Sequence, residues 1–269
     1  MKLKMHGFYD KITDHLWHEG DTEPYIDCYD DSAILTANTP KEKSIALMIE
    51  PRSITPKGYA AIENGYWAHF KYVFTHDSKL LAEIPNARYL EVGAVWSYSD
   101  EPKTKFCSLC CSFKEMCELH MIRKELAYEF ENSGIVDVYG DYKGRGSASW
   151  VDCSEYLKDY RFSIIIENYI DDNYFTEKIL NCFAHKVLPV YWGARDIDKH
   201  FDKYGIFHVN SKSDIKEFVK IMSNSPGFGE IYYENVRESI EKNYRKVKAY
   251  SRVENWLFDT YGESLERMK

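Results

Sequence analysis

An acid and a base stand side by side in a segment that the sequence predicts to be helical. The Asp-Asp-Asn run at 171–173 offers helix-capping side chains, and apolar residues then recur at helical spacing from 175 to 183. This pattern places Glu177 and Lys178 in the first helical turn. An acid is ordinary there, but a lysine at the positive end of the helix dipole costs up to about 1 kcal/mol.

A bound phosphate group would reverse that cost. Free N–H groups at a helix start and a lysine ammonium together form an anion site, and a neighbouring carboxylate accepts hydrogen bonds from sugar hydroxyls. We therefore expect Lys178 to bind a diphosphate and Glu177 to bind a sugar hydroxyl, as a nucleotide-sugar site requires. The alternative, in which Lys178 only extends into water, accounts for these two residues equally well.

A second basic group lies earlier in the chain. His120 and Arg123 fall in the first turns of a predicted helix at 115–131, directly after an apolar, cysteine-rich strand. Phosphates bind where a loop leads into a helix, and a guanidinium can bind two phosphate oxygens at once. We expect both side chains to bind an anionic donor, although a surface salt bridge from Arg123 to Glu118 is an equally simple explanation.

Two further candidates directly follow or end predicted strands. In open parallel sheets, ligands gather at the carboxyl ends of the strands. Asn168 follows the apolar run 162–167, and Glu50 ends the run 44–50 just before Pro51. A carboxylate at such an edge can accept a proton, so Glu50 is the candidate general base. Position alone favours the simpler interpretation of Glu50 as a capping or solvent-facing acid.

Strands and helices alternate along most of the chain. Strands are predicted at the apolar runs 44–50, 69–76, 87–96, 105–111, 135–139, 162–167 and 187–192. Helices are predicted at 56–65, 77–84, 115–131, 153–160 and 174–186, and from about 213 to the end of the chain. Such alternation predicts an α/β fold class with parallel sheets that helices cover on both faces.

A polar, proline-containing stretch at 97–105 is the predicted linker between two such α/β segments. We predict an N-terminal, acceptor-side domain at 1–100 and a C-terminal, nucleotide-sugar-binding domain at 101–245, with a last helix at 246–269 that could pack back on the first domain. The glycine-rich run 139–149 matches no phosphate-binding glycine motif, and we predict a mobile loop over the cleft there.

The bulk composition limits the partners. The net charge of −8, from 43 acidic and 35 basic residues, argues against a polyanionic partner such as DNA but leaves a local basic pocket open. The N-terminal segment lacks the uninterrupted apolar stretch of a signal peptide, and no later run approaches the roughly 20 apolar residues of a membrane span. We expect a soluble, cytoplasmic protein.

Cysteine and aspartate patterns bear on metal binding. Four of the seven cysteines crowd into residues 107–117, where their pattern suits reduced core thiols better than a zinc cluster. Asp196 and Asp198 form a literal D-x-D pattern, but three-residue matches are common by chance. We expect no metal site.

The segment 160–201 resembles the α1,3/α1,4-fucosyltransferase family. The matching parts, in order, are an apolar strand that ends in Glu-Asn, a Tyr-Phe-Thr-Glu-Lys helix start and a Pro-Val-Tyr-Trp-Gly strand. The run 105–126 is similar to the strand, loop and helix that open the family's donor domain, and the run 49–56 is similar to the acidic loop of its acceptor domain. The similarity covers roughly 104 to 210.

This resemblance implies a GT-B fold, in which the parallel sheets of two Rossmann-like domains face a central cleft. It also implies an inverting, metal-independent transfer from a GDP-sugar, with no cofactor required. The residues that would bind the donor by position are Asn168, Tyr174, Glu177 and Lys178. Arg123 would neutralise charge on the departing GDP, and Glu50 would deprotonate the acceptor hydroxyl.

We therefore predict an inverting glycosyltransferase that moves L-fucose from GDP-fucose to an acceptor hydroxyl of a glycan. A second hypothesis keeps the enzyme class but changes the substrates, to another nucleotide sugar or to a non-glycan acceptor such as a hydroxylated nucleobase in modified DNA. A third hypothesis is a catalytically inactive nucleotide-binding protein of the same fold. A basic stripe on the acceptor domain would favour DNA, and donor turnover would exclude the inactive protein.

Overall fold

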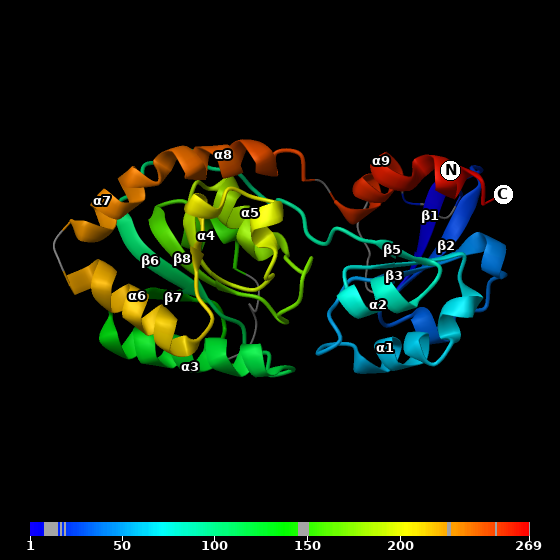
Figure 1. The fold of residues 1–269 in the computed structure, drawn as a ribbon, viewed down its shortest axis with the longest axis horizontal. Helices are drawn as coiled ribbons and strands as arrows, with labels where there is room; N and C mark the ends of the chain where they lie inside the picture. Colours follow the sequence, from blue (N-terminus) through cyan, green and yellow to red (C-terminus); the bar gives the residue numbers. More distant parts are fainter. Residues whose placement is uncertain are drawn as a thin grey trace. The chain divides into compact units, whose positions relative to one another are not determined.

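The chain divides into two compact units, each built on its own sheet. The computed structural model describes residues 1–7, 16, 18, 20–144, 151–224, 227–250 and 252–268 (Figure 1). The first unit comprises Met1–Val92, Asp171–Tyr174 and Ser251–Lys269, and the second comprises Gly93–Ile170 and Phe175–Tyr250. The chain thus passes into the second unit before the predicted boundary at 100 and leaves it after the predicted boundary at 245. Of the predicted glycine-rich loop at 139–149, residues 145–149 lie outside the described residues.

The first unit holds a five-stranded sheet in which all neighbouring strands are parallel. Its strands follow chain order from edge to edge: β1 (Lys2–His6), β2 (Tyr25–Asp30), β3 (Ser44–Met48), β4 (Tyr72–Thr75) and β5 (Ala87–Tyr89). Its described helices are α1 (Pro56–Glu63), α2 (Ser78–Glu83), α9 (Val253–Glu266) and the short 3-10 helices η1 (Ile34–Thr36), η2 (Lys41–Lys43) and η3 (Tyr66–His69).

Both faces of this sheet are buried. Neighbouring residues of a strand point to opposite faces, so Ile45 and Leu47 join an apolar cluster with α9, whereas Ala46 joins one with α1 and α2. Figure 1 shows α9 on one side of the sheet and α1 and α2 on the other. Tyr261 of α9 donates a hydrogen bond of 3.2 Å to the backbone oxygen of Tyr89. The last helix of the chain therefore packs on the first sheet.

The first two strands of this sheet are not among the strands predicted from the sequence. In β1, Lys2 and Lys4 flank the buried Leu3. In β2, the buried Asp27 and Asp30 interrupt an otherwise apolar run. Both strands form because parallel pairing supplies their backbone hydrogen bonds, whereas the apolar pattern that predicts strands is broken by charge in each.

The second unit holds another parallel, five-stranded sheet, with the strand order β10-β9-β8-β6-β7. Its strands are β6 (Lys105–Cys110), β7 (Asp137–Tyr139), β8 (Tyr160–Ile166), β9 (Leu188–Trp192) and β10 (Phe207–His208). Its described helices are α3 (Glu118–Ser133), α4 (Cys153–Leu157), α5 (Glu177–Ala184), α6 (Lys212–Asn224), α7 (Phe228–Asn235), α8 (Arg237–Val247), η4 (Ile197–Lys199) and η5 (Lys203–Gly205).

Helices cover both faces of the second sheet as well. Ile164 and Ile166 of β8 pack into a cluster with α3 and α6, whereas the intervening Ile165 packs into a cluster with α4 and α5 (Figure 1). A central strand that is buried on both faces explains why residues 162–167 read as one continuous apolar run. The expected alternation of strands and helices is thus confirmed in this half of the chain.

The strand order places a topological switch point between β6 and β8. From β6 the chain moves outward to β7, returns past β6 to β8, and then continues in the opposite direction to β9 and β10. The connections on either side of the switch point leave the sheet toward opposite faces, so a crevice opens at the carboxyl ends of β6 and β8. This crevice is where a ligand is expected from topology alone.

All seven cysteines are free, and five of them, including Cys107 and Cys111 of the clustered run, are buried. Desolvation by burial raises the pKa of the Cys111 thiol to about 11.

Across the residues that the structure describes, no helix has both the length and the hydropathy needed to cross a bilayer.

Candidate functional site

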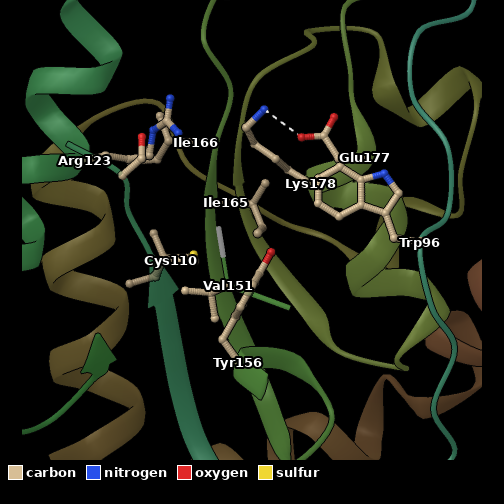
Figure 2. A pocket seen from close by; sticks show the side chains of 11 residues that line it. Trp96, Cys110, Arg123, Val151, Tyr156, Ile165, Ile166, Glu177 and Lys178 are labelled. Carbon is tan, nitrogen blue, oxygen red and sulfur yellow. Dashed lines mark hydrogen bonds and ion pairs between the residues drawn. The ribbon is translucent and has the colours of Figure 1, made fainter. Parts of the chain in front are cut away.

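A pocket of about 180 Å³ lies at the switch point of the second unit (Figure 2). Its walls come from the ends of β6 and β8, from the first turns of α3 and α5, and from α4. The lining residues are Trp96, Cys110, Ser112, Arg123, Val151, Tyr156, Ile164, Ile165, Ile166, Glu177 and Lys178. Three of the predicted site residues, Arg123, Glu177 and Lys178, therefore share one pocket.

The start of α5 differs from the expected one. Thr176 is the N-cap, because its hydroxyl accepts a hydrogen bond from the backbone N–H of Lys178, and the helix begins at Glu177. The predicted caps at 171–173 do not serve this helix. Asp171 instead accepts hydrogen bonds of 3.1 Å and 3.0 Å from the backbone nitrogen and hydroxyl of Ser78, within the first unit.

Lys178 is held by three oxygen atoms. Its Nζ lies 3.0 Å from the hydroxyl of Thr176, 3.3 Å from Oε2 of Glu167 and 3.5 Å from Oε1 of Glu177. Burial works against the charge of Lys178, but the two carboxylates outweigh it, so the pKa of Lys178 is raised above its usual value. The alternative in which this side chain only extends into water is therefore wrong.

Arg123 is fastened to the end of β8 by Asn168. The amide oxygen of Asn168 accepts a hydrogen bond of 2.5 Å from NH2 of Arg123. The guanidinium is buried, with 8% of the residue exposed, and its Nε has no hydrogen-bond partner among the described residues. Figure 2 shows the charged ends of Arg123 and Lys178 at the same end of the pocket. A buried N–H donor without a partner is costly.

His120 lies beside Arg123 as a neutral side chain. Its Nδ1 accepts a hydrogen bond of 3.2 Å from the backbone N–H of Met116, so Nε2 carries the proton and donates to Asn168 at 3.0 Å. Burial, followed by the nearby charge of Arg123, lowers the pKa of His120 to about 4. His120 thus contributes a hydrogen bond to Asn168 rather than a positive charge at neutral pH. It does not line the pocket.

Tyr174 belongs to the first unit rather than to this pocket. It is 1% exposed, and its ring packs on His76 with the centroids 4.5 Å apart. The role of Tyr174 in donor binding therefore stays a prediction.

Glu50 also lies in the first unit, two residues beyond the end of β3. The carboxylate of Asp31 accepts backbone hydrogen bonds of 3.0 Å from both Ile49 and Glu50. Burial, together with the charge of Glu50, raises the pKa of Asp31 well above its usual range. Asp31 was missed because it lies far from Glu50 in the sequence, and only the pairing of β2 with β3 joins them.

A close approach of the backbone brings Trp96 to the pocket. Gly93 has a φ of +111°, and a Cβ there would lie 2.8 Å from the backbone nitrogen of Glu177, so only glycine fits. The backbone N–H of Trp96 then donates a hydrogen bond of 2.9 Å to Asn181 of α5. The predicted strand at 87–96 is wrong beyond Tyr89, where β5 ends. From Gly93 to Trp96 the backbone instead lies against α5.

Two lining residues and one buried acid complete the site. The sequence carries no signal that would select Trp96 or Tyr156, because neither lies in a motif. Glu167 did carry a signal, since it ends the apolar run of β8 just before Asn168.

Within the described residues, no group of three or more His, Cys, Asp or Glu side chains could hold a metal ion. Metal independence itself stays a prediction.

The comparison with protein families identifies one match. Residues 96–256 match the sequence model of glycosyltransferase family 10 (fucosyltransferase), C-terminal part. This span contains the pocket and every predicted site residue except Glu50. It is more than half of the 269-residue chain.

Two curated relatives share shorter segments with this chain. Alpha-(1,3)-fucosyltransferase FucT of Helicobacter pylori is 25% identical over 92 residues, which cover 33% of this chain and 19% of the relative. Alpha-(1,3)-fucosyltransferase C of Drosophila melanogaster is 28% identical over 127 residues, which cover 45% of this chain and 30% of the relative. The matches therefore span less than a third of the length of either relative.

A solved structure supports the fold. The crystal structure of an alpha1,3-fucosyltransferase with GDP-fucose aligns with 90% of this chain and 78% of its own, with a TM-score of 0.53 at 14% identity. At this identity the likeness concerns the fold alone. It confirms the expected α/β, GT-B-like class with two parallel sheets.

Proposed function

The chain belongs to glycosyltransferase family 10, and we propose that it transfers L-fucose from GDP-fucose to an acceptor hydroxyl of a glycan, with inversion at the sugar carbon. One observation carries the donor half of this proposal. Arg123 and Lys178, from two different helices, line one pocket at the switch point, and the Nε of Arg123 is buried without a partner among the described residues.

The two cationic side chains at one end of the pocket favour an anionic ligand. The charge of Arg123 opposes the protonated form of Lys178, so the two groups repel each other. A diphosphate between them would replace this repulsion by two charge-assisted contacts. The pocket also lies at the carboxyl ends of parallel strands, where nucleotides bind in open α/β sheets.

The rest of the pocket suits the sugar and the base of a nucleotide. Glu177 is a hydrogen-bond acceptor for hydroxyl groups of ribose or fucose. Trp96 and Tyr156 supply aromatic surface on which a ring can stack. The amide oxygen of Asn168 accepts hydrogen bonds from both Arg123 and His120. We therefore assign Asn168 and His120 to donor binding through their effect on the position of Arg123.

The proposed reaction is a single displacement. Glu50 takes the proton of the acceptor hydroxyl, whose oxygen forms a bond to the anomeric carbon as the bond from that carbon to the β-phosphate oxygen breaks. The electron pair of the broken bond stays on GDP, where Arg123 and Lys178 stabilise the added negative charge. No step in this scheme uses a metal ion or a cofactor.

The first experiment is a panel of nucleotides tested for thermal stabilisation. A ligand that binds only the folded protein raises its stability with the logarithm of its concentration over Kd. We expect GDP and GDP-fucose to stabilise the protein and UDP-glucose to do so less. The donor assignment is wrong if GDP has no effect. If another nucleotide sugar alone stabilises the protein, that nucleotide sugar is the donor in place of GDP-fucose.

The second experiment tests the acceptor. GDP-fucose is incubated with a set of glycans and, separately, with DNA that contains hydroxymethylated bases, and the products are separated by mass spectrometry. We expect a glycan product. Transfer to DNA alone would overturn the assignment of a glycan acceptor. Donor binding without any transfer would indicate an inactive member of the family.

The cytoplasmic location stays a prediction from the sequence.

A further inference from the structure

The end of β8 carries a carboxylate that is completely enclosed. Glu167 is 0% exposed and immediately follows the last residue of the strand. A Cβ at Gly193, after the neighbouring strand β9, would lie 2.7 Å from Cγ of Glu167. The absence of a side chain at Gly193 therefore leaves the space in which this carboxylate lies.

The start of α5 supplies hydrogen-bond donors to both oxygens of this carboxylate. Oε1 accepts a hydrogen bond of 3.0 Å from the backbone N–H of Thr176, and Oε2 accepts one of 2.9 Å from its hydroxyl. Oε2 also accepts a hydrogen bond of 3.3 Å from Nζ of Lys178. Burying a carboxylate costs several kcal/mol unless it is paired and hydrogen-bonded, so these contacts must be maintained for the site to hold its shape.

The same contacts decide where the ammonium of Lys178 lies. Lysine has three N–H donors, and here they face Thr176 at 3.0 Å, Glu167 at 3.3 Å and Glu177 at 3.5 Å. The first two acceptors are buried, whereas Glu177 lines the pocket with its side chain 27% exposed. The longest of the three contacts is thus the one on the ligand side (Figure 2).

We propose that Glu167 is a positioning residue, which fixes the ammonium of Lys178 at the pocket wall and keeps it protonated, so that a bound diphosphate displaces only Glu177. This inference rests on the proposed function, because it assigns the diphosphate of the donor to this pocket. It adds a second consequence of donor binding. Once Lys178 turns its third N–H to phosphate, the carboxylate of Glu177 becomes available to sugar hydroxyls.

The charges around Lys178 predict the effect of neutralising Glu167. Burial and the charge of Arg123 on α3 lower the pKa of Lys178, whereas Glu167 on β8 and Glu177 on α5 raise it. His120 on α3, which also senses the charge of Lys178, is already held neutral. Without the charge of Glu167, only Glu177 offsets the two opposing effects. The pKa of Lys178 must then fall, and the lysine loses its proton at a lower pH.

The direct test is the titration of Lys178 by NMR in protein labelled with ¹³C at the lysine ε position. The variant Lys178→Arg identifies the resonance by its disappearance. We expect Lys178 to titrate above 10.5 in the unaltered protein and to shift down by about one unit or more in Glu167→Gln. The matched control is Glu125→Gln, which removes an exposed acid paired with Lys212 and should leave Lys178 unchanged. An unchanged Lys178 pKa in Glu167→Gln overturns the proposal.

Calorimetry with GDP gives the functional readout. The affinity of the unaltered protein should be nearly the same at about pH 7.5 and about pH 9.5, whereas that of Glu167→Gln should fall by about twofold or more at the higher pH, because a larger fraction of Lys178 has then lost its proton. A merely structural role would weaken binding equally at both values and would contradict the proposal. Absence of GDP binding by the unaltered protein would instead refute the proposed function, while the NMR result would still decide the role of Glu167.

A double variant covers the case in which a single variant does not fold. Lys178→Met leaves the buried carboxylate of Glu167 unpaired, so we expect a strong loss of stability. Adding Glu167→Gln removes that unpaired charge and should restore much of the melting temperature. If the double variant is no more stable than Lys178→Met, the two residues do not act as a pair, and the proposal fails.

Discussion

Nε2 of His120 donates a hydrogen bond of 3.0 Å to the amide oxygen of Asn168 and thereby joins the first turn of α3 to the end of β8. The same oxygen accepts from Arg123. His120 and Asn168 are 48 positions apart in the chain, so this contact exists only because β6 and β8 are neighbours in the sheet. It allows a strand end to set the position of a cation on a helix.

Asn168→Ala tests this relationship. The change leaves a buried imidazole N–H and a guanidinium N–H without their acceptor, at a cost of about 1–3 kcal/mol each. We expect a lower melting temperature and about tenfold weaker GDP binding by calorimetry, because Arg123 is no longer held at the pocket. Unchanged GDP affinity would show that Arg123 is positioned by other contacts.

Lys178→Ala tests the anion site and the buried ion pair together. Donor affinity and transfer rate should both fall by about tenfold or more, because a charge-assisted contact to the diphosphate is lost. The free energy of unfolding should also fall by about 3–5 kcal/mol, because Glu167 stays buried without its counter-charge. Calorimetry and urea unfolding measure the two effects. Lys178→Arg is the control that keeps the charge, and an unchanged GDP affinity in Lys178→Ala would remove the phosphate role.

Glu50→Gln tests the proposed base. We expect the transfer rate to fall by about 10²–10⁴-fold, because the amide cannot take the acceptor proton, while GDP affinity stays near normal. Product formation from GDP-fucose measures the first effect and calorimetry the second. Glu42→Gln alters an exposed acid of the same unit and serves as the control. Full turnover in Glu50→Gln would exclude this residue as the base.

The buried His76 should make the stability of the first unit sensitive to acid. It is 1% exposed, and burial lowers its pKa from 6.5 to about 4. Because the folded pKa is the lower one, the stabilisation by neutral His76 is present above pH 6.5 and is lost as the pH falls toward 4. Its full size is on the order of 3 kcal/mol. Urea unfolding at about pH 7 and about pH 4.5 should show a smaller loss in His76→Phe than in the unaltered protein. An equal loss in both would contradict the prediction, and the exposed His18 offers a control as His18→Phe.

Chelation tests metal independence. Since the proposed scheme stabilises the departing diphosphate with Arg123 and Lys178, transfer should continue at an unchanged rate after dialysis against EDTA. Assays with and without added Mn²⁺ complete the test. Loss of activity that Mn²⁺ restores would show that a metal ion takes part.

Much of the donor side can be predicted from the sequence because its signals are local. The apolar run of β8, the helical periodicity of α5 and the apolar run of β9 are adjacent in the chain, so periodicity identifies them. The predicted caps at 171–173 were wrong, because Thr176 caps α5. The resemblance to a fucosyltransferase family rests on the same residues, and the family match confirms it. Prediction was weaker where charge interrupts a strand, as in β1 and β2, or where an extended segment pairs with a helix, as at Trp96.

The sequence by itself determined the α/β class and most of the alternation of strands and helices along the chain. It also identified Arg123, Glu177 and Lys178 as candidate ligand-binding residues. Only the tertiary structure decided that Glu167 holds Lys178, that Asn168 holds Arg123, and that Tyr174 lies against His76 in the other unit. The physical reason is that the charge and position of a side chain depend on which buried groups surround it. Those neighbours come from distant strands that only the folded sheet brings together.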